Sequence, residues 1–197
     1  MSDIEEHPSS VLKLHIAATG APPLKSSPAL QPKHQLFPSL ALGLIAKLVE
    51  DIVNVWNEEI NEIAFIIGDF GKEVERNLID IANDIGAEGK IVYQDQPLGT
   101  AHAILCAKES LKGNVVVAFA DTLFKADFKL EKNSDGIIWV NKIDDPSSFG
   151  VVKVNEEKII TDFVEKPQFF VSDLAIIGLS LIHISETTRR RGISYAV

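Results

Sequence analysis

In the middle of the chain, stretches whose apolar residues are spaced as in a helix alternate with short apolar runs. At three places apolar residues recur every three to four residues, which is typical of one face of a helix. These stretches begin near Leu44, Val74 and Thr100. Short apolar runs lie between them at 63–67 and 91–93, and a third run follows at 115–120. Such runs are typical of strands that are buried on both faces of a parallel sheet. The alternation of strand and helix predicts βαβ units in an α/β sandwich.

The pattern changes after residue 120, because strand-like runs then follow one another without long helices between them. These runs are 137–140, 150–154, 159–164 and 174–177. The polar residues 155–158 between two of them predict a hairpin turn. The second half of the central stretch is therefore expected to add mainly β structure.

The two ends of the chain differ from the periodic stretch 44–179. Residues 1–43 hold six of the nine prolines, and proline blocks helix interiors and central strands. We expect this stretch to be irregular. Residues 180–197 lose the apolar period and carry Arg189–Arg191, three of the four arginines. We expect this tail to be disordered and foreign to the central domain.

Composition and charge limit the classes of protein. The 197 residues are 46% apolar and 24% charged, which is typical of a globular domain. A net charge of −9 argues against nucleic acid or an anionic membrane as the main partner. No apolar run approaches the roughly 20 residues of a membrane-spanning helix. Cys106 is the single cysteine, which favours a reducing, cytoplasmic setting.

The loop 94–103 leaves one predicted strand and enters a predicted helix. Ligands of open α/β sheets bind at such carboxyl ends of strands. The Gln94 amide can both donate to and accept from the edge of a base, and Gly99 lets a flat ligand approach the backbone closely. An ordinary strand-to-helix turn has the same spacing, so the loop alone leaves both interpretations open.

Two further loops carry charged side chains at strand ends. Asp121 follows the 115–120 run, where a carboxylate suits Mg²⁺, a hard cation that prefers oxygen ligands. A helix cap or a solvated turn is the alternative. Glu165 and Lys166 leave another strand together, ahead of Pro167. They could meet a sugar hydroxyl and a phosphate, or they could be a surface charge pair.

Taken together and in order, these loops resemble the nucleotidyl transferase family. That family includes glucose-1-phosphate thymidylyltransferases, N-acetylglucosamine-1-phosphate uridylyltransferases and mannose-1-phosphate guanylyltransferases. The resemblance runs from about Lys47 to Leu179. It is carried by Gln94 with 97–101, by 120–121, by 145–152 and by 163–167.

The resemblance implies a fold and a reaction. The fold is a Rossmann-like, three-layer α/β sandwich with a mainly parallel, mixed sheet of the nucleotide-diphospho-sugar transferase type. The reaction joins a nucleoside triphosphate to a sugar 1-phosphate and releases pyrophosphate. Such phosphoryl chemistry depends on alignment and on neutralisation of charge.

It also implies a role for each matching residue. The base would be contacted by Gln94, Gly99 and Thr100, and Asp121 would bind the catalytic Mg²⁺. The remaining implied contacts are Gly150 through its backbone to the sugar, Glu165 to sugar hydroxyls, and Lys166, as a catalytic cation, to the sugar phosphate.

The chain departs from the family where phosphates are expected to bind. Family members begin with a strand and a glycine-rich loop of the type G-x-G-x-R, whereas no arginine precedes Arg76 here. We therefore expect a fragment truncated at both ends, a sheet that lacks its first strand and part of its C-terminal half, low stability, and no transferase activity of this chain. Two rival hypotheses are a non-catalytic relative that binds nucleotide-sugars and an unrelated α/β scaffold.

Overall fold

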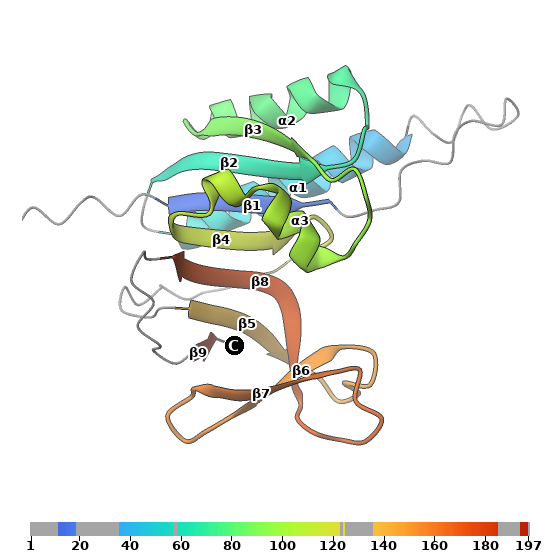
Figure 1. Ribbon diagram of the computed structural model, residues 1–197, viewed down its shortest axis with the longest axis vertical. Helices are drawn as coiled ribbons and strands as arrows, with labels where there is room; N and C mark the ends of the chain where they lie inside the picture. The colour runs from blue at the N-terminus through green and yellow to red at the C-terminus, as the bar shows by residue number, and fades with distance from the viewer. Residues whose placement is uncertain are drawn as a thin grey trace, which may run out of the picture.

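One mixed sheet organises the protein. The computed structural model describes residues 12–18, 36–56, 59–122, 124, 136–184 and 194–196. The strands lie in the order β3-β2-β1-β4-β8-β5-β9, with β6 and β7 attached through β8 (Figure 1). Their bounds are β1 Leu12–Ala17, β2 Ile60–Ile67, β3 Glu88–Tyr93, β4 Gly113–Phe119, β5 Gly136–Lys142, β6 Gly150–Val154, β7 Ile160–Glu165, β8 Leu174–Ile184 and β9 Ser194–Ala196.

Parallel and antiparallel strands occupy different parts of this sheet. Within the group β1 to β4, each strand runs parallel to the strands beside it. The long strand β8 runs antiparallel to both β4 and β5, and β9 pairs with β5 in parallel. The sheet is thus parallel on one side of β4 and largely antiparallel on the other.

Helices cover both faces of the parallel part (Figure 1). The helices are α1 Leu36–Val55, α2 Lys72–Asp84, α3 Thr100–Cys106 and the short 3₁₀ turn η1 Lys108–Ser110. Leu14 of β1 belongs to the core cluster that contains α1 and α2 side chains. Ala17 packs with Ala103 and Ala107 in a second cluster on the α3 side. Successive strand residues face opposite sides of a sheet, so the predicted three-layer α/β fold is confirmed.

The prediction that residues 1–43 are irregular and that the sheet lacks its first strand is wrong at β1. This strand lies between β2 and β4 and pairs in parallel with both. Leu12, Leu14 and Ile16 are buried. The prediction relied on the average proline density of residues 1–43 and overlooked the run from residue 9 to residue 21, which contains no proline. The reason given for low stability, an open central strand position, therefore disappears.

Helix α1 begins at Leu36, eight residues before the predicted start at Leu44. Pro38 was one reason to exclude a helix there, but it is the third residue of α1. Proline is tolerated in the first helical turn because the N–H that it lacks would have no helical acceptor. The helix crosses the expected boundary between residues 43 and 44. The segment 19–35 lies outside the described residues.

The prediction of a disordered tail is wrong from residue 180 to residue 184. Strand β8 continues through these residues and pairs Ser180 with Val117 and Leu181 with Val116. Leu179 and Leu181 are buried, whereas Ile182 is exposed. The alternation is that of a strand with one buried face, but it is too short to stand out from sequence. The arginines Arg189–Arg191 lie outside the described residues.

The predicted hairpin turn is present between β6 and β7. The Asn155 side-chain oxygen accepts hydrogen bonds from the backbone N–H groups of Glu157 and Ile159, at 3.1 and 2.8 Å. The hairpin joins the sheet where Val151 pairs with Ala175 at the start of β8. It lies at the end of the molecule opposite β3 (Figure 1).

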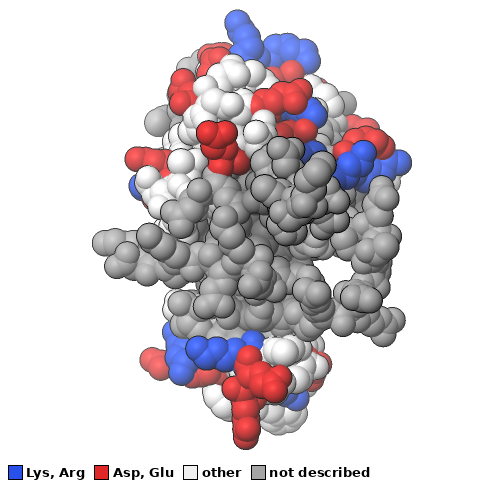
Figure 2. Space-filling model, turned by 90° about the vertical axis from the view of Figure 1, so that its left-hand side faces the viewer, with Lys and Arg blue, Asp and Glu red and all other residues white. Residues whose placement is uncertain are grey.

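Charges of both signs are mixed on the face shown in Figure 2. Blue and red side chains lie side by side at both ends of that face, with undescribed residues between them. Several of these opposite charges form ion pairs, including Lys90 with Glu62 and Lys153 with Asp162. None of the helices in the described part of the chain has the length and apolar character needed to cross a membrane.

Candidate functional site

The carboxyl ends of the parallel strands meet at one edge of the sheet. Backbone hydrogen bonds continue the pairing past the strand ends, from Ala18 N–H to the Ile66 carbonyl at 2.9 Å and from Ala120 N–H to the Ala17 carbonyl at 3.1 Å. The Gln94 N–H donates to the Ile67 carbonyl at 2.8 Å. The residues that directly follow β3 and β4 are therefore held by hydrogen bonds along the same edge of the sheet.

The loop after β3 folds back on itself through Gln94. The Gln94 side-chain nitrogen donates to the Gly99 carbonyl at 3.1 Å. Gly99 has φ +93°, a left-handed conformation that favours glycine, and Thr100 then begins α3. Gln94 is partly buried, whereas Gly99 and Thr100 are exposed. These three predicted base-binding residues thus form one compact loop.

Asp121 lies in a tight turn immediately after β4, and it is exposed. The turn is closed by a hydrogen bond from Thr122 N–H to the Phe119 carbonyl at 2.9 Å. The Thr122 hydroxyl also donates to the Ile177 carbonyl of β8 at 3.1 Å. The turn that carries Asp121 is therefore attached to β8.

Gly178 permits this attachment. A Cβ at position 178 would lie 2.8 Å from Thr122 Oγ1 and 3.0 Å from Phe119 Cδ2. Gly178 also has φ +75°, which L side chains rarely adopt. The close contact between the Asp121 turn and β8 therefore requires glycine at this position.

The third group of predicted residues lies on the β6–β7 hairpin. Gly150 pairs with Glu165 across the two strands. Lys166 follows with φ +43°, and its N–H donates to the Phe149 carbonyl at 3.0 Å. Glu165 and Lys166 are both exposed. The sugar and phosphate contacts implied by the resemblance thus come from one short, hydrogen-bonded unit.

Strand β8 joins the hairpin to the edge that carries Asp121. Its first residues pair with β6 at Ala175, and its later residues pair with β4 at Leu179. On the other side, β2 and β1 separate β3 from β4. Three strand spacings place Gln94 and Asp121 about 14 Å apart along the edge. A ligand that reaches both must therefore have several linked groups.

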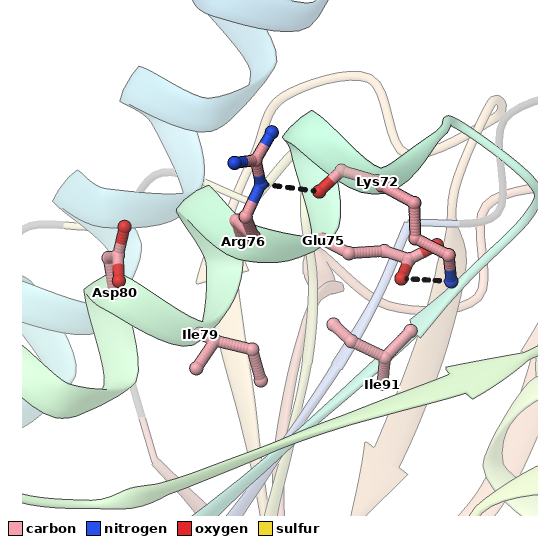
Figure 3. Close-up of a pocket in the computed structure, with 6 residues that line it drawn as sticks. All are labelled: Lys72, Glu75, Arg76, Ile79, Asp80 and Ile91. Atoms are coloured by element: carbon pink, nitrogen blue, oxygen red, sulfur yellow. Dashed lines mark hydrogen bonds and ion pairs between the residues drawn. The ribbon is translucent and has the colours of Figure 1, made fainter.

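A cavity between α2 and β3 lies elsewhere (Figure 3). It has a volume of about 290 Å³ and contains none of the predicted site residues. Lys72 on its wall forms an ion pair with Glu75 at 2.7 Å. Hydrogen bonds from Lys72 and then from Tyr93 lower the pKa of Glu75. The cavity wall carries two basic and two acidic side chains, so it offers no net charge to attract a phosphate.

The donor set at Asp121 fits a hard cation only in part. Its exposed carboxylate offers oxygen, the ligand that Mg²⁺ prefers. Within the described residues, no group of three or more His, Cys, Asp or Glu side chains is arranged to hold a metal. Mg²⁺ is often bound by one or two carboxylates together with substrate phosphates, and Asp121 suits that mode.

Sequence reasoning missed one contact in this site. The Nδ1 of His102, a residue that the sequence analysis did not single out, lies 3.1 Å from the Gln94 side-chain nitrogen. The available signal was its place in the first turn of the helix that follows Gly99. That place turns the ring back towards the loop.

Comparison with known proteins supports the resemblance. The sequence profile of the family described as Nucleotidyl transferase matches residues 30–181, a match that begins 17 residues before Lys47. The low-salt glycan biosynthesis nucleotidyltransferase Agl11 of Haloferax volcanii is 30% identical over 152 residues, which cover 74% of this chain and 42% of Agl11. A glucose-1-phosphate thymidylyltransferase of Streptomyces antibioticus is 31% identical over 129 residues, which cover 61% of this chain and 36% of that protein.

The fold also has solved counterparts. A Bacillus anthracis protein assigned as a glucose-1-phosphate thymidylyltransferase, solved with sucrose, superimposes with a TM-score of 0.68 at 22% identity. The superposition covers 88% of this chain and 72% of that one. The chain spans less than half the length of the two sequence relatives.

Proposed function

The chain belongs to the nucleotidyl transferase family, and from that premise we propose that it binds a nucleoside triphosphate and a sugar 1-phosphate along the carboxyl edge of its sheet. The base lies against Gln94, Gly99 and Thr100. The sugar lies against the β6–β7 hairpin at Gly150 and Glu165. The phosphates lie between them, beside Asp121.

One observation carries this proposal. The three groups of predicted residues leave the sheet at the carboxyl ends of β3 and β4 and at the hairpin joined to β8. Gln94 and Asp121 stand about 14 Å apart along the edge, which suits a ligand built of linked base, phosphate and sugar. Ligand sites of open α/β sheets lie at this edge.

The proposed reaction transfers the nucleotidyl group. An oxygen of the sugar 1-phosphate attacks the α-phosphorus of the triphosphate and forms a new P–O bond. The bond from the α-phosphorus to the bridging oxygen breaks, and its electron pair leaves with pyrophosphate. Lys166 is exposed, and we propose that its ammonium approaches the attacking phosphate, where its charge favours an in-line arrangement of the reacting groups.

Asp121 is the proposed ligand of Mg²⁺. When bound, Mg²⁺ neutralises part of the phosphate charge and helps to align the phosphates. The hydrogen bond between Thr122 and Ile177 fixes the turn that presents the carboxylate. The Glu165 carboxyl lies close to Gly150, and its proposed role is to accept hydrogen bonds from sugar hydroxyls.

The sequence also favours a second candidate, a relative that binds nucleotide-sugars without turnover. No arginine precedes Arg76, and no G-x-G-x-R loop is present before it. A triphosphate carries several negative charges, and the chain itself has a net charge of −9. In this second candidate, the chain binds nucleotide-sugars and is inactive as a transferase. A cytoplasmic location remains part of the proposal.

Two assays on the purified chain separate these candidates. Pyrophosphate release is measured with each of the common nucleoside triphosphates against glucose, N-acetylglucosamine and mannose 1-phosphates, with and without Mg²⁺. Binding of the corresponding nucleotide-sugars is measured by calorimetry. Binding with Mg²⁺-dependent release supports the enzyme, and binding without release supports the second candidate. No binding of any of these ligands would contradict both.

A further inference from the structure

Strand β8 is bent where it passes between the two parts of the candidate site. Ile138 of β5 pairs with Ser180, whereas Val140 pairs with Ile176. One residue of β5 therefore stands opposite three residues of β8, 177–179. Extra residues of this kind form a β-bulge, which bends the strand that carries them. Figure 1 shows this bend, with β8 curving from β6 towards β4.

The strand that neighbours β8 changes at the same place. Strand β5 pairs along one edge of β8 on both sides of the bulge. Along the other edge, β8 pairs with β4 as far as Leu179 and with β6 at Ala175. The residues between these two pairings, 176–178, therefore connect the parallel part of the sheet to the β6–β7 hairpin.

Thr122 holds the bulge to the Asp121 turn. Thr122 is buried, and its hydroxyl donates to the Ile177 carbonyl at 3.1 Å. The next residue of β8, Gly178, leaves no room for a Cβ beside Thr122 Oγ1. A bulged residue is left out of the ladder of the sheet, so its backbone polar groups need other partners. The Thr122 hydroxyl is such a partner for Ile177.

We propose that Thr122 is a positioning residue that links the hairpin to the Asp121 carboxylate through the bulge of β8. The hairpin joins β8 at Ala175, two residues before Ile177, and Asp121 directly precedes Thr122. A ligand that shifts the hairpin therefore also shifts the turn, through a short stretch of paired backbone and one hydrogen bond. This inference rests on the proposed function and adds that the sugar site and the Asp121 carboxylate are coupled.

The size of this coupling is limited by the single hydrogen bond that carries it. Coupling between two sites is reciprocal, so a sugar that affects ligand binding at Asp121 is affected by that ligand to the same extent. Loss of one neutral hydrogen bond corresponds to roughly a 2- to 10-fold change in an equilibrium. Removal of the Thr122 hydroxyl should therefore reduce the coupling by a factor in this range, while each ligand still binds alone.

The test compares four forms of the full chain: wild type, Thr122→Val, Thr122→Ser and Thr161→Val. Thr122→Val keeps a branched side chain but removes the hydroxyl, whereas Thr122→Ser keeps the hydroxyl. Thr161→Val is the matched control, because the Thr161 hydroxyl also donates to a backbone carbonyl, that of Lys153 at 3.3 Å, but within the hairpin alone. Backbone amide signals are followed by NMR during titration with glucose, N-acetylglucosamine and mannose 1-phosphates, without nucleotide or Mg²⁺.

In wild type and in Thr161→Val, we expect the Asp121 signal to move together with the Gly150 signal, with one dissociation constant. In Thr122→Val, Gly150 should still respond, but the movement of Asp121 should largely disappear, and Thr122→Ser should restore it. If Asp121 moves as far in Thr122→Val as in wild type, the sugar phosphate acts on the turn directly and the inference is overturned. A wild-type Asp121 signal that stays still while Gly150 responds would overturn it as well. Both results leave the proposed function intact.

Calorimetry measures the same coupling as a ratio of dissociation constants. The factor by which Mg²⁺ tightens the binding of UDP-glucose is compared with the factor for UDP, which lacks the sugar. In Thr122→Val, the factor for UDP-glucose should fall roughly 2- to 10-fold further than the factor for UDP. Equal losses for the two ligands would show a merely structural role for Thr122 and would overturn the inference. Failure of wild type to bind any of these ligands would contradict the proposed function and, with it, this inference.

Discussion

Gly150 and Glu165 face each other across β6 and β7 so closely that a Cβ on Gly150 would lie 2.9 Å from Glu165 Oε2. The Glu165 carboxyl thus occupies the space that a side chain at position 150 would need. This geometry suits the binding of a sugar, whose hydroxyls can meet both groups.

Gly150→Ala should weaken nucleotide-sugar binding, because the new methyl group displaces the Glu165 carboxyl. We expect the dissociation constant to rise about 10-fold, equivalent to about 1.4 kcal/mol, with little change in the Kd for the nucleotide alone. Calorimetry with UDP-glucose and UDP provides the comparison. Gly43→Ala is the matched control, since a Cβ there meets nothing within 4 Å. Equal effects on UDP-glucose and UDP in Gly150→Ala would argue against a sugar contact.

Asp121→Asn should remove most of the Mg²⁺ dependence of triphosphate binding, because the amide has lost the negative charge that attracts the cation. We expect the enhancement by Mg²⁺ to fall about 10-fold or more. Asp69→Asn is the control, since Asp69 follows β2 at the same edge but accepts a hydrogen bond from Gly71 N–H. If the two variants behave alike, the Asp121 carboxylate has no special role in binding the metal.

Thr122→Val should reduce the free energy of unfolding by about 1 kcal/mol, because the buried hydroxyl donates to the Ile177 carbonyl and valine cannot. Thr122→Ser should recover most of this loss. Gly178→Ala should cost more, about 1 to 3 kcal/mol, because it adds a clash and backbone strain at the same contact. Urea denaturation measures all three variants. Wild-type stability in Gly178→Ala would contradict the close packing of β8 on the Asp121 turn.

His15 should make stability depend on pH. Burial is the main cause that lowers the pKa of this imidazole to about 4, even though the nearby Glu62 raises it. The unfolded chain then binds a proton near pH 6.5 that the folded chain does not, so stability is lost as pH falls from about 6.5 to about 4. The full loss is about 3 kcal/mol.

His15→Leu isolates this effect because leucine does not titrate. Unfolding free energies of wild type and His15→Leu are compared by urea denaturation at several pH values in that window. Plotted against pH, the unfolding free energies of the two proteins should diverge as pH falls, because the wild type loses more stability. Parallel curves would mean that His15 is protonated equally in the folded and unfolded chains.

The central fold could be predicted from the sequence because its strands are strongly apolar and its helices are periodic. Residues 63–67 and 115–120 each became a buried strand. The predictions that failed were those based on the average proline content of a whole segment. Because residues 1–43 are rich in proline, β1 was not predicted. Its apolar residues Leu12, Leu14 and Ile16 alternate with polar ones over a strand of only six residues. Pro38 concealed the first turn of α1, where proline carries little cost.

The site was predictable only as far as its residues lie on identifiable strand ends. Asp121 and Gln94 were placed correctly at a common edge, since parallel strands end together. The contact of His102 with Gln94 was not predictable, because it depends on the loop turning back at Gly99. The roles of Gln94, Gly99, Thr100, Asp121, Gly150, Glu165 and Lys166 remain predictions.

The central claim is that these residues bind one ligand at one edge of the sheet. It is tested most directly by NMR titration of the isotope-labelled chain with UDP-glucose and Mg²⁺. We predict that the backbone signals of Gly99, Asp121 and Gly150 shift together, with one dissociation constant. Shifts confined to the α2–β3 cavity around Lys72 and Arg76, with those three signals unchanged, would contradict it.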